Sequence, residues 1–195
     1  MKFNLSEIQK IIEERRTIKP ENYTTRKVHK EIVEKMLNAA KWAPTHGMTQ
    51  PWKFHVFMEE GIKKLAEFQS DLYKEITPPS KFNAQKHKKM KERPLLASAI
   101  IAICMKRQES GKIPEVEEVE AVACAVQNMS LLATAYGLGT YWGSGGVTYS
   151  NQMRGFLQLG EKDKCLGFLY VGYPSIDWPK GQRKPIEYFT TWRLN

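Results

Sequence analysis

Two long apolar runs constrain the fold of this chain more than any other feature of its sequence. The first extends from Leu95 to Met105 and contains three isoleucines, and the second, CLGFLYV, extends from Cys165 to Val171. Apolar runs of this length, bounded by polar and turn-forming residues, are typical of strands buried on both faces. The sequence therefore predicts a sheet in which the first run is a central strand and the second is another buried strand.

Apolar residues at helical spacing predict helices around these strands. The first helix begins at Ser6, which fits a capping box with Gln9, and it ends in a pair of arginines. A long helix begins at Pro114 and stops at Gly137, because proline suits a first helical position and glycine a C-terminal cap. The other predicted helices span residues 30–43, 62–73 and 151–159, the last one capped by Ser150 and ended by Gly160.

A polar loop separates the second predicted helix from a strand. Pro44 has no N–H and disfavours helical geometry in the residue before it, so this helix should stop near Ala43. From Trp52 to Met58 apolar and polar residues alternate, as they do in a strand. The intervening loop can present hydroxyls, an imidazole and an amide to a ligand, or it can be a plain connector, which its residues alone favour.

The 195 residues are sufficient for a substantial core, and we expect residues 1–195 to form a single domain. No apolar run approaches the roughly 18 residues of a membrane span. The polar N-terminus has no signal-peptide pattern. We therefore expect a soluble, cytoplasmic protein that does not bind membranes.

The cysteines and histidines do not have the spacing of a metal site. Cys104, Cys124 and Cys165 are far apart in the sequence and lie in apolar surroundings, and no C-x-x-C or Cys/His pattern of a zinc site occurs. We predict reduced, buried thiols rather than a structural disulfide. The sequence also contains no G-x-S-x-G or H-E-x-x-H motif, so it gives no sign of a serine hydrolase or a zinc protease.

Basic residues outnumber acidic ones by 30 to 21, which gives a formal net charge of +9. Much of this excess lies between Lys81 and Arg93. Such a stretch is usually a solvated helix face, which is the interpretation we favour. The stretch could also steer the phosphates of NAD(P)H or bind nucleic acid, but Phe82 is its only aromatic residue, so an interleaved stacking platform is missing.

Two further segments point to an anionic or flat ligand. Arg15 and Arg16 either compensate a helix dipole or bind phosphate through paired guanidinium bonds. The glycine-rich segment from Gly137 to Gly146 lets the backbone approach a flat ligand, although a tight turn without a ligand has the same composition. This segment is not a dinucleotide-binding fingerprint, because no strand–GxGxxG–helix arrangement surrounds it.

Several segments resemble, in the same order, those of the FMN-dependent nitroreductase family. RRTIK at 15–19 resembles its R-x-S-x-K segment, and APTHGMTQPWKF at 43–54 resembles A-P-S-x-x-N-x-Q-P-W. The glycine-rich GLGTYWGSG at 137–145 resembles G-L-G-T-x-W-x-x-G, and the helix before it and the GYP at 172–174 are also similar. The resemblance runs from about residue 11 to 192 and favours the compact, single-domain branch, the NAD(P)H nitroreductases of bacteria.

The resemblance implies an α+β fold with a mostly antiparallel central sheet and helices on both faces. It also implies an FMN-dependent NAD(P)H oxidoreductase that transfers hydride by a ping-pong mechanism, through N5 of FMN, to nitroaromatics, quinones or similar electron-poor acceptors. Because FMN carries the chemistry, no side chain is assigned a catalytic role and no metal is expected. Two subunits share each FMN in this family, so we expect a homodimer.

Carried over by position, the resemblance assigns two groups of cofactor-binding residues. The phosphate and ribityl chain would be held by Arg15, Arg16, Thr17, Lys19 and Arg183, with Lys184 as an alternative to Arg183. The flavin ring would be surrounded by His46, Gln50, Gly143, Ser144 and Gly145, with Trp42 contributing through its backbone. This chain has Met48 where many relatives have asparagine, and Ser144 where some larger members have an acidic residue.

Two functions from other classes are weighed against this enzyme. The chain could be a basic nucleic-acid-binding module that uses Lys81–Arg93, or it could be a flavin-binding protein without turnover. The ordered matches favour the enzyme, and with it a small-molecule acceptor and no specific nucleic-acid partner.

Overall fold

The computed structural model describes residues 3–194 and contains an antiparallel sheet of four strands. In sheet order the strands are β1 (Trp52–Phe57), β2 (Ala99–Met105), β4 (Lys164–Gly172) and β3 (Gly139–Gly143). Each neighbouring pair is antiparallel. The two apolar runs therefore form the two inner strands, as the sequence predicts.

The inner strand β2 is buried along its whole length. Its side chains alternate between the two faces of the sheet, as they do in any strand. Ile101 and Ile103 belong to the hydrophobic core on one face, whereas Ile100 and Ala102 belong to the core on the other. Both faces of such a strand must be covered.

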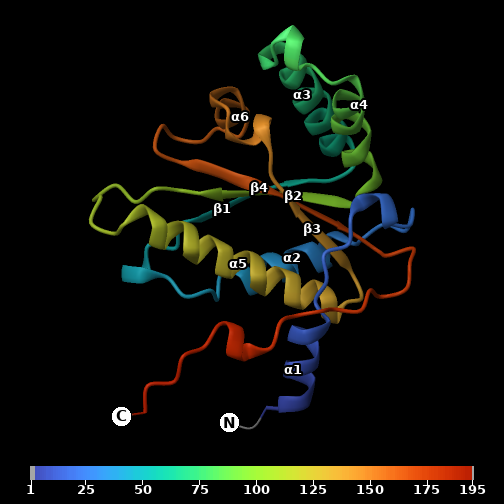
Figure 1. Ribbon diagram of the computed structural model, residues 1–195. Helices are drawn as coiled ribbons and strands as arrows, with labels where there is room; N and C mark the ends of the chain where they lie inside the picture. The colour runs from blue at the N-terminus through green and yellow to red at the C-terminus, as the bar shows by residue number, and fades with distance from the viewer. Residues whose placement is uncertain (1–2, 195) are drawn as a thin grey trace.

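Helices provide this cover on both faces (Figure 1). One face carries α2 (Lys30–Ala40) and α5 (Glu115–Ala135), and the other carries α3 (Glu60–Ile76), α4 (Ala84–Glu92) and α6 (Asn151–Phe156). The predicted α+β fold is confirmed by this arrangement. Within the described residues, no helix combines the length and the apolar character needed to cross a bilayer.

The limits of the first helix, α1 (Leu5–Glu14), differ from the prediction. Its N-cap is Asn4, whose Oδ1 accepts a hydrogen bond from the backbone N–H of Glu7 at 3.3 Å, so the assignment of this role to Ser6 is wrong. Asparagine is as good an N-cap as serine, and a cap at residue 4 places Ser6 inside the first turn. The arginine pair lies beyond the last turn rather than within it.

Two other elements are shorter than predicted because tight turns precede or follow them. Helix α2 ends at Ala40, since the backbone N–H of Ala43 bonds to the Ala40 carbonyl at 3.1 Å and tightens the chain ahead of the proline. Strand β2 begins at Ala99 rather than Leu95, because Pro94 lies in a 3₁₀ turn that occupies the start of the apolar run. Helix α3 is longer than predicted and continues to Ile76.

The ends of α5 and α6 show how well glycine predicts a helix end. Helix α5 ends as predicted, because Gly137 has a φ of 68° and the following N–H of Leu138 bonds back to the Ala133 carbonyl at 2.9 Å. At its other end, Pro114 is the N-cap rather than the first helical residue. Helix α6 is capped by Ser150 as predicted, but it ends at residue 156, and Gln158 rather than Gly160 takes the left-handed conformation there.

All three cysteines are free thiols. Cys104 and Cys165 are buried, in agreement with the prediction. Cys124 is exposed, so the prediction of a buried thiol is wrong at this position. It lies on the side of α5 opposite to core residues such as Val122 and Met129, and an apolar sequence context did not reveal which side would face the sheet.

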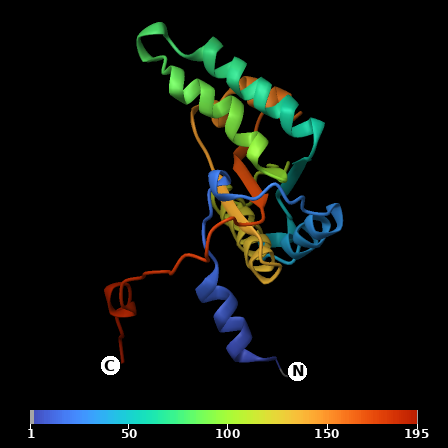
Figure 2. The same ribbon diagram turned by 90° about the vertical axis from the view of Figure 1, so that its right-hand side faces the viewer.

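Two segments at the chain ends extend away from the body of the fold, on the same side of it (Figure 2). Helix α1 has no buried residue, and the apolar stripe predicted for it is exposed at Leu5, Ile8 and Ile12. The C-terminal tail is exposed at several large apolar residues as well, namely Ile186, Tyr188, Phe189, Trp192 and Leu194. Apolar surface of this extent on two adjacent arms marks an interaction surface.

Candidate functional site

The arginine-containing segment 15–19 lies along the edge of the sheet, next to the glycine-rich strand. Thr17 pairs with Thr140 of β3 in a parallel bridge, and the backbone N–H of Ile18 donates to the Thr140 carbonyl at 3.0 Å. The segment thereby extends the sheet beyond β3. Two of the motifs singled out in the sequence, more than 100 residues apart, are in direct backbone contact.

Arg16 fastens the C-terminal tail to this segment. Its Nε donates to the Pro179 carbonyl at 2.9 Å, and its Nη1 donates to the carbonyls of Glu13 and Arg15 at 2.5 and 2.8 Å. The guanidinium lies so close to Gly181 that a Cβ at this glycine would overlap it. Arg16 thus holds the tail in place through the Pro179 carbonyl and its contact with Gly181.

Docking of the tail brings a third arginine, Arg183, towards the first two. The pKa of Arg15 is lowered, first by its burial and then by the positive charges of Arg183 and Arg16. Within residues 3–194 none of these three arginines forms an ion pair with a carboxylate. Three neighbouring guanidinium groups without an acidic partner make a site suited to a phosphate.

The glycine-rich segment faces a cavity of about 320 Å³. Gly143, Ser144 and Gly145 form part of its wall, and Lys86, Lys89 and Arg93, on or next to α4, form another part. The lysines of α4 are exposed, as expected of a solvated face, and two of them also border this cavity. Phe82 packs against Tyr73 and His87.

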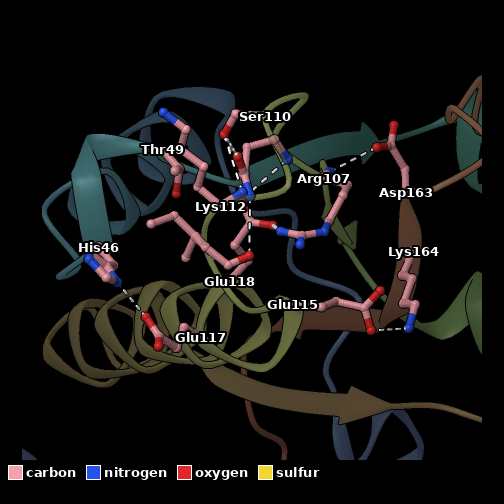
Figure 3. Close-up of polar contacts among 12 residues, drawn as sticks. His46, Thr49, Arg107, Ser110, Lys112, Glu115, Glu117, Glu118, Asp163 and Lys164 are labelled. Carbon is pink, nitrogen blue, oxygen red and sulfur yellow. Dashed lines mark hydrogen bonds and ion pairs between the residues drawn. The ribbon is translucent and has the colours of Figure 1, made fainter.

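His46 lies elsewhere, beside the first turn of α5 (Figure 3). Its Nδ1 is 2.6 Å from Oε2 of Glu117. In the same region Glu118 pairs with Arg107, and Glu115 pairs with Lys164. The acidic first turn of α5 thus holds the His46 loop and the start of β4 in place, and the position of an acidic turn at the positive end of the helix dipole is favourable.

The loop around His46 has an unusual backbone. Gly47, Met48 and Gln50 all have a positive φ, between 46° and 55°, which is uncommon for the two residues that have side chains. The side-chain Oγ1 of Thr45 accepts a hydrogen bond from the backbone N–H of Gln50 at 3.1 Å and supports this conformation. Met48 is 72% exposed. Backbone strain of this kind clusters at functional sites, which makes the loop a candidate binding loop.

Trp42 lies on a different part of the surface from the arginine-containing segment and the loop around His46. Its side chain is 80% exposed and lies beside Ile11 of α1 and Leu131 of α5, in a shallow apolar hollow. The Trp42 side chain is therefore close to α1. The role expected from the sequence concerns only the Trp42 backbone.

The predicted site residues form two groups that are separate within one chain. The first, which we call the arginine group, consists of Arg15, Arg16, Thr17, Lys19, Arg183 and the segment 143–145. The second, the His46 loop (residues 45–50), precedes β1, which is at the opposite edge of the sheet from β3. The His46 loop contacts the first turn of α5, whereas segment 15–19 pairs with the strand that follows the last turn. The 21 residues of α5 span about 30 Å, which separates the two groups.

Sequence reasoning named the basic stretch 81–93 but did not single out the three of its residues that line the cavity. Lys86 and Lys89 are three residues apart and Lys89 and Arg93 are four apart, so the three side chains share one side of the helix. That spacing was a usable signal. It was not decisive, because the lysines at 88 and 91 would support a charged face on the other side equally well.

An antiparallel sheet with helices on both faces is also the architecture of solved nitroreductase-like structures. Residues 12–173 match the family model described as the nitroreductase family. The chain belongs to the nitroreductase family, and it is an oxidoreductase of that family.

Individual relatives support this family assignment. The "Putative NAD(P)H nitroreductase YdjA" of Escherichia coli K12 is 32% identical over 146 residues, which cover 75% of this chain and 78% of the relative. The crystal structure of a nitroreductase-like family protein from Bacillus cereus superposes with a TM-score of 0.83 at 29% identity and covers all of both chains. The FMN-dependent nitroreductase NfnB from Mycobacterium smegmatis, solved in complex with NADPH, has a TM-score of 0.73 at 16% identity, with 96% of this chain and 98% of NfnB covered, and it shares the fold.

Proposed function

We propose that this protein is an FMN-dependent NAD(P)H oxidoreductase that reduces electron-poor acceptors such as nitroaromatics or quinones. The observation that carries the proposal is the arginine group, in which Arg15, Arg16 and Arg183 gather beside a glycine-rich strand and pair with no carboxylate of residues 3–194. Family membership and the NAD(P)H nitroreductase names of the relatives support it. When bound, FMN accepts a hydride at N5 and passes it on, so the protein has to bind and orient rather than supply a catalytic acid or base.

The arginine group fits the phosphate end of FMN. Arg15 and Arg183 would form charge-assisted hydrogen bonds to the phosphate, which would offset the burial and the neighbouring positive charges that lower the pKa of Arg15. Arg16 would act indirectly, since its hydrogen bond to the Pro179 carbonyl holds the tail that carries Arg183. Thr17 and Lys19, on the same extended segment, would face the ribityl chain.

The segment Gly143–Gly145 would lie against the flavin ring. A Cβ at Gly145 would meet no atom within 4 Å, so there is open space beside this backbone for a flat ligand. Lys19 or a backbone N–H would stabilise negative charge on the ring's polar edge. His46 and Gln50 would complete the enclosure of the ring.

A homodimer would bring the two separate groups to one FMN. The two groups lie near opposite ends of the roughly 30 Å helix α5, so a single chain does not place both at one cofactor. In a two-fold dimer with the α5 helices antiparallel, the first turn of one helix lies against the last turn of the other. The exposed side of α5, the apolar stripe of α1 and the apolar tail would form the interface.

The dimer makes a prediction about Cys124, which lies on the exposed side of α5. Replacing it by arginine should place charges in the interface, so Cys124→Arg should sediment as a monomer and release FMN at micromolar concentration. Gln85→Arg, an equally exposed change on α4, is the control and should remain dimeric. Analytical ultracentrifugation with detection at the flavin absorption band checks both. A stable wild-type monomer with bound FMN and full activity on dilution would contradict the dimer.

The function itself is tested by the visible spectrum of the purified protein, recorded without oxygen before and after addition of NADH or NADPH. We expect flavin absorption bands that bleach with the reductant, and NAD(P)H oxidation that then depends on an added acceptor. A protein that neither retains nor binds FMN would refute the proposal. Bleaching without any acceptor-dependent turnover would identify a flavin-binding protein rather than an enzyme.

A further inference from the structure

The cavity beside the glycine-rich segment is lined by three basic side chains. Lys86, Lys89 and Arg93 line it from the α4 side, and none of its lining residues is acidic. One carboxylate, Glu21, lies behind this wall and pairs with both Arg93, at 2.6 Å, and Lys89, at 3.6 Å. A single carboxylate shared by two of three cations leaves a net positive charge directed at the cavity.

The fixed member of the three cations is Arg93. Its side chain is only 17% exposed, its Nε and Nη2 both bond to Oε1 of Glu21, and its guanidinium lies 5.4 Å from the centre of the Tyr141 ring. Lys86 and Lys89 line the cavity from α4, where Nζ of Lys86 lies 5.1 Å from the centre of the Tyr73 ring and Nζ of Lys89 is 3.6 Å from Glu21. Arg93 thus gives the cavity a fixed positive charge, and Lys86 and Lys89 add two ammonium groups to the same wall.

The remaining walls suit a planar ring. Tyr141, Phe168 and Tyr170 provide aromatic surface, and Met90 and Val147 add apolar contacts. Burial raises the pKa of Tyr170 to about 12, so its phenol is neutral at physiological pH and adds no negative charge. The volume of about 320 Å³ is at the small end of the range for ligand pockets, enough for a single substituted ring and small for a dinucleotide.

From these observations we propose that the cavity is a specificity subsite for the electron acceptor, and that it selects planar aromatic acceptors with an anionic group, such as a carboxylate. The anionic group would bind Lys86 and Lys89, with Arg93 behind them. This inference rests on the proposed function, because it names the acceptor class of the same site. The 2′-phosphate of NADPH is also an anionic group that these cations would bind. The test therefore has to separate the acceptor from the nucleotide.

The test compares two double variants with the same change in net charge. Lys86→Gln/Lys89→Gln removes the cations that line the cavity, and Lys88→Gln/Lys91→Gln removes two exposed lysines of the same helix. The acceptors are 4-nitrobenzoate and its neutral analogue 4-nitrobenzyl alcohol, each with NADH and with NADPH. We expect the ratio of kcat/KM for the anionic over the neutral acceptor to fall about tenfold or more in the first variant and to stay constant in the second.

A binding measurement without turnover completes the design. Isothermal titration of the oxidised protein with 4-nitrobenzoate should give a Kd about tenfold higher in Lys86→Gln/Lys89→Gln than in the wild type and in the control variant. Equal Kd values, with equal acceptor ratios in an enzyme that turns over, would overturn the subsite and leave the proposed function intact. A change confined to the NADPH/NADH preference would also overturn it and identify the nucleotide phosphate as the occupant. A wild type without NAD(P)H turnover would refute the proposed function, and the titration would still decide whether the cavity binds the anion.

Discussion

Replacing Arg15 by alanine should weaken FMN binding about 100-fold. Arg15 is a partly buried member of the arginine group, and its pKa is lowered by burial and by the charges of Arg183 and Arg16. A bound phosphate would bond to this guanidinium in a partly desolvated place, where a charge-assisted hydrogen bond contributes about 1.5–3 kcal/mol. Loss of that interaction corresponds to a factor of about 10 to 100 in Kd, and loss of both bonds of a bidentate contact to the upper end.

The measurement is a fluorescence titration of the apoprotein with FMN, with Lys88→Ala as the control. Lys88 is also basic, but its side chain is 73% exposed, and its Nζ lies 4.0 Å from Oε1 of Glu92. Its removal should therefore change the Kd for FMN less than twofold. Both variants lose one positive charge, so a general electrostatic effect would weaken both equally. Equal FMN affinities in the two variants would remove the phosphate-anchor role from Arg15.

Replacing Gly167 by alanine should destabilise the fold more than any surface change. Gly167 lies in β4 at a bulge, where the register with β2 shifts between Ile103 and Cys104. Its φ of 138° lies outside the range that side-chain-bearing residues adopt readily. An added Cβ would overlap Nε1 of Trp142 and come within 2.7 Å of the Gly143 carbonyl oxygen. The Trp142 ring is held there by its hydrogen bond to the Leu166 carbonyl at 3.2 Å.

Because both backbone strain and a backbone clash result, we expect a loss of about 3 kcal/mol or more in the free energy of unfolding. For a chain of this size that corresponds to a melting temperature about 10 °C lower. The clash would also displace Gly143, so FMN retention should fall in the folded fraction. Gly155→Ala is the control: no atom lies within 4 Å of its added Cβ, and alanine should stabilise α6 slightly. Melting curves at equal protein concentration check both, and equal melting temperatures would contradict this account of β4.

The elements that the sequence predicted correctly are those that local physics specifies. Strand β2 is an apolar run that only a doubly covered strand can bury, and Gly137 ends α5 because no other residue adopts its backbone as easily. The errors occurred where two local solutions have similar energy. Asn4 and Ser6 are equally good caps, and Gln158 reversed the chain before the glycine that was expected to do so.

The candidate site was predictable in its residues but not in its arrangement. Short motifs suggested the segments 15–19 and 143–145 as binding elements, and the bridge between Thr17 and Thr140 places the first beside the strand that leads into the second. Their contact with FMN stays a prediction. The structural use of Arg16 was not visible in the sequence, because the tail carbonyl that it binds, that of Pro179, lies 163 residues away.

The sequence by itself determined which segments form the inner strands, where α5 ends, and which residue types can hold a phosphate and a flat ring. It could do so because periodicity, glycine and proline act within a few residues of the chain. The tertiary structure alone decided the sheet order, which places the His46 loop and the arginine group at opposite edges, and the side of α4 that faces the cavity. These features depend on contacts between residues far apart in the sequence, where the free energy of packing the whole core, and not any local preference, selects the arrangement.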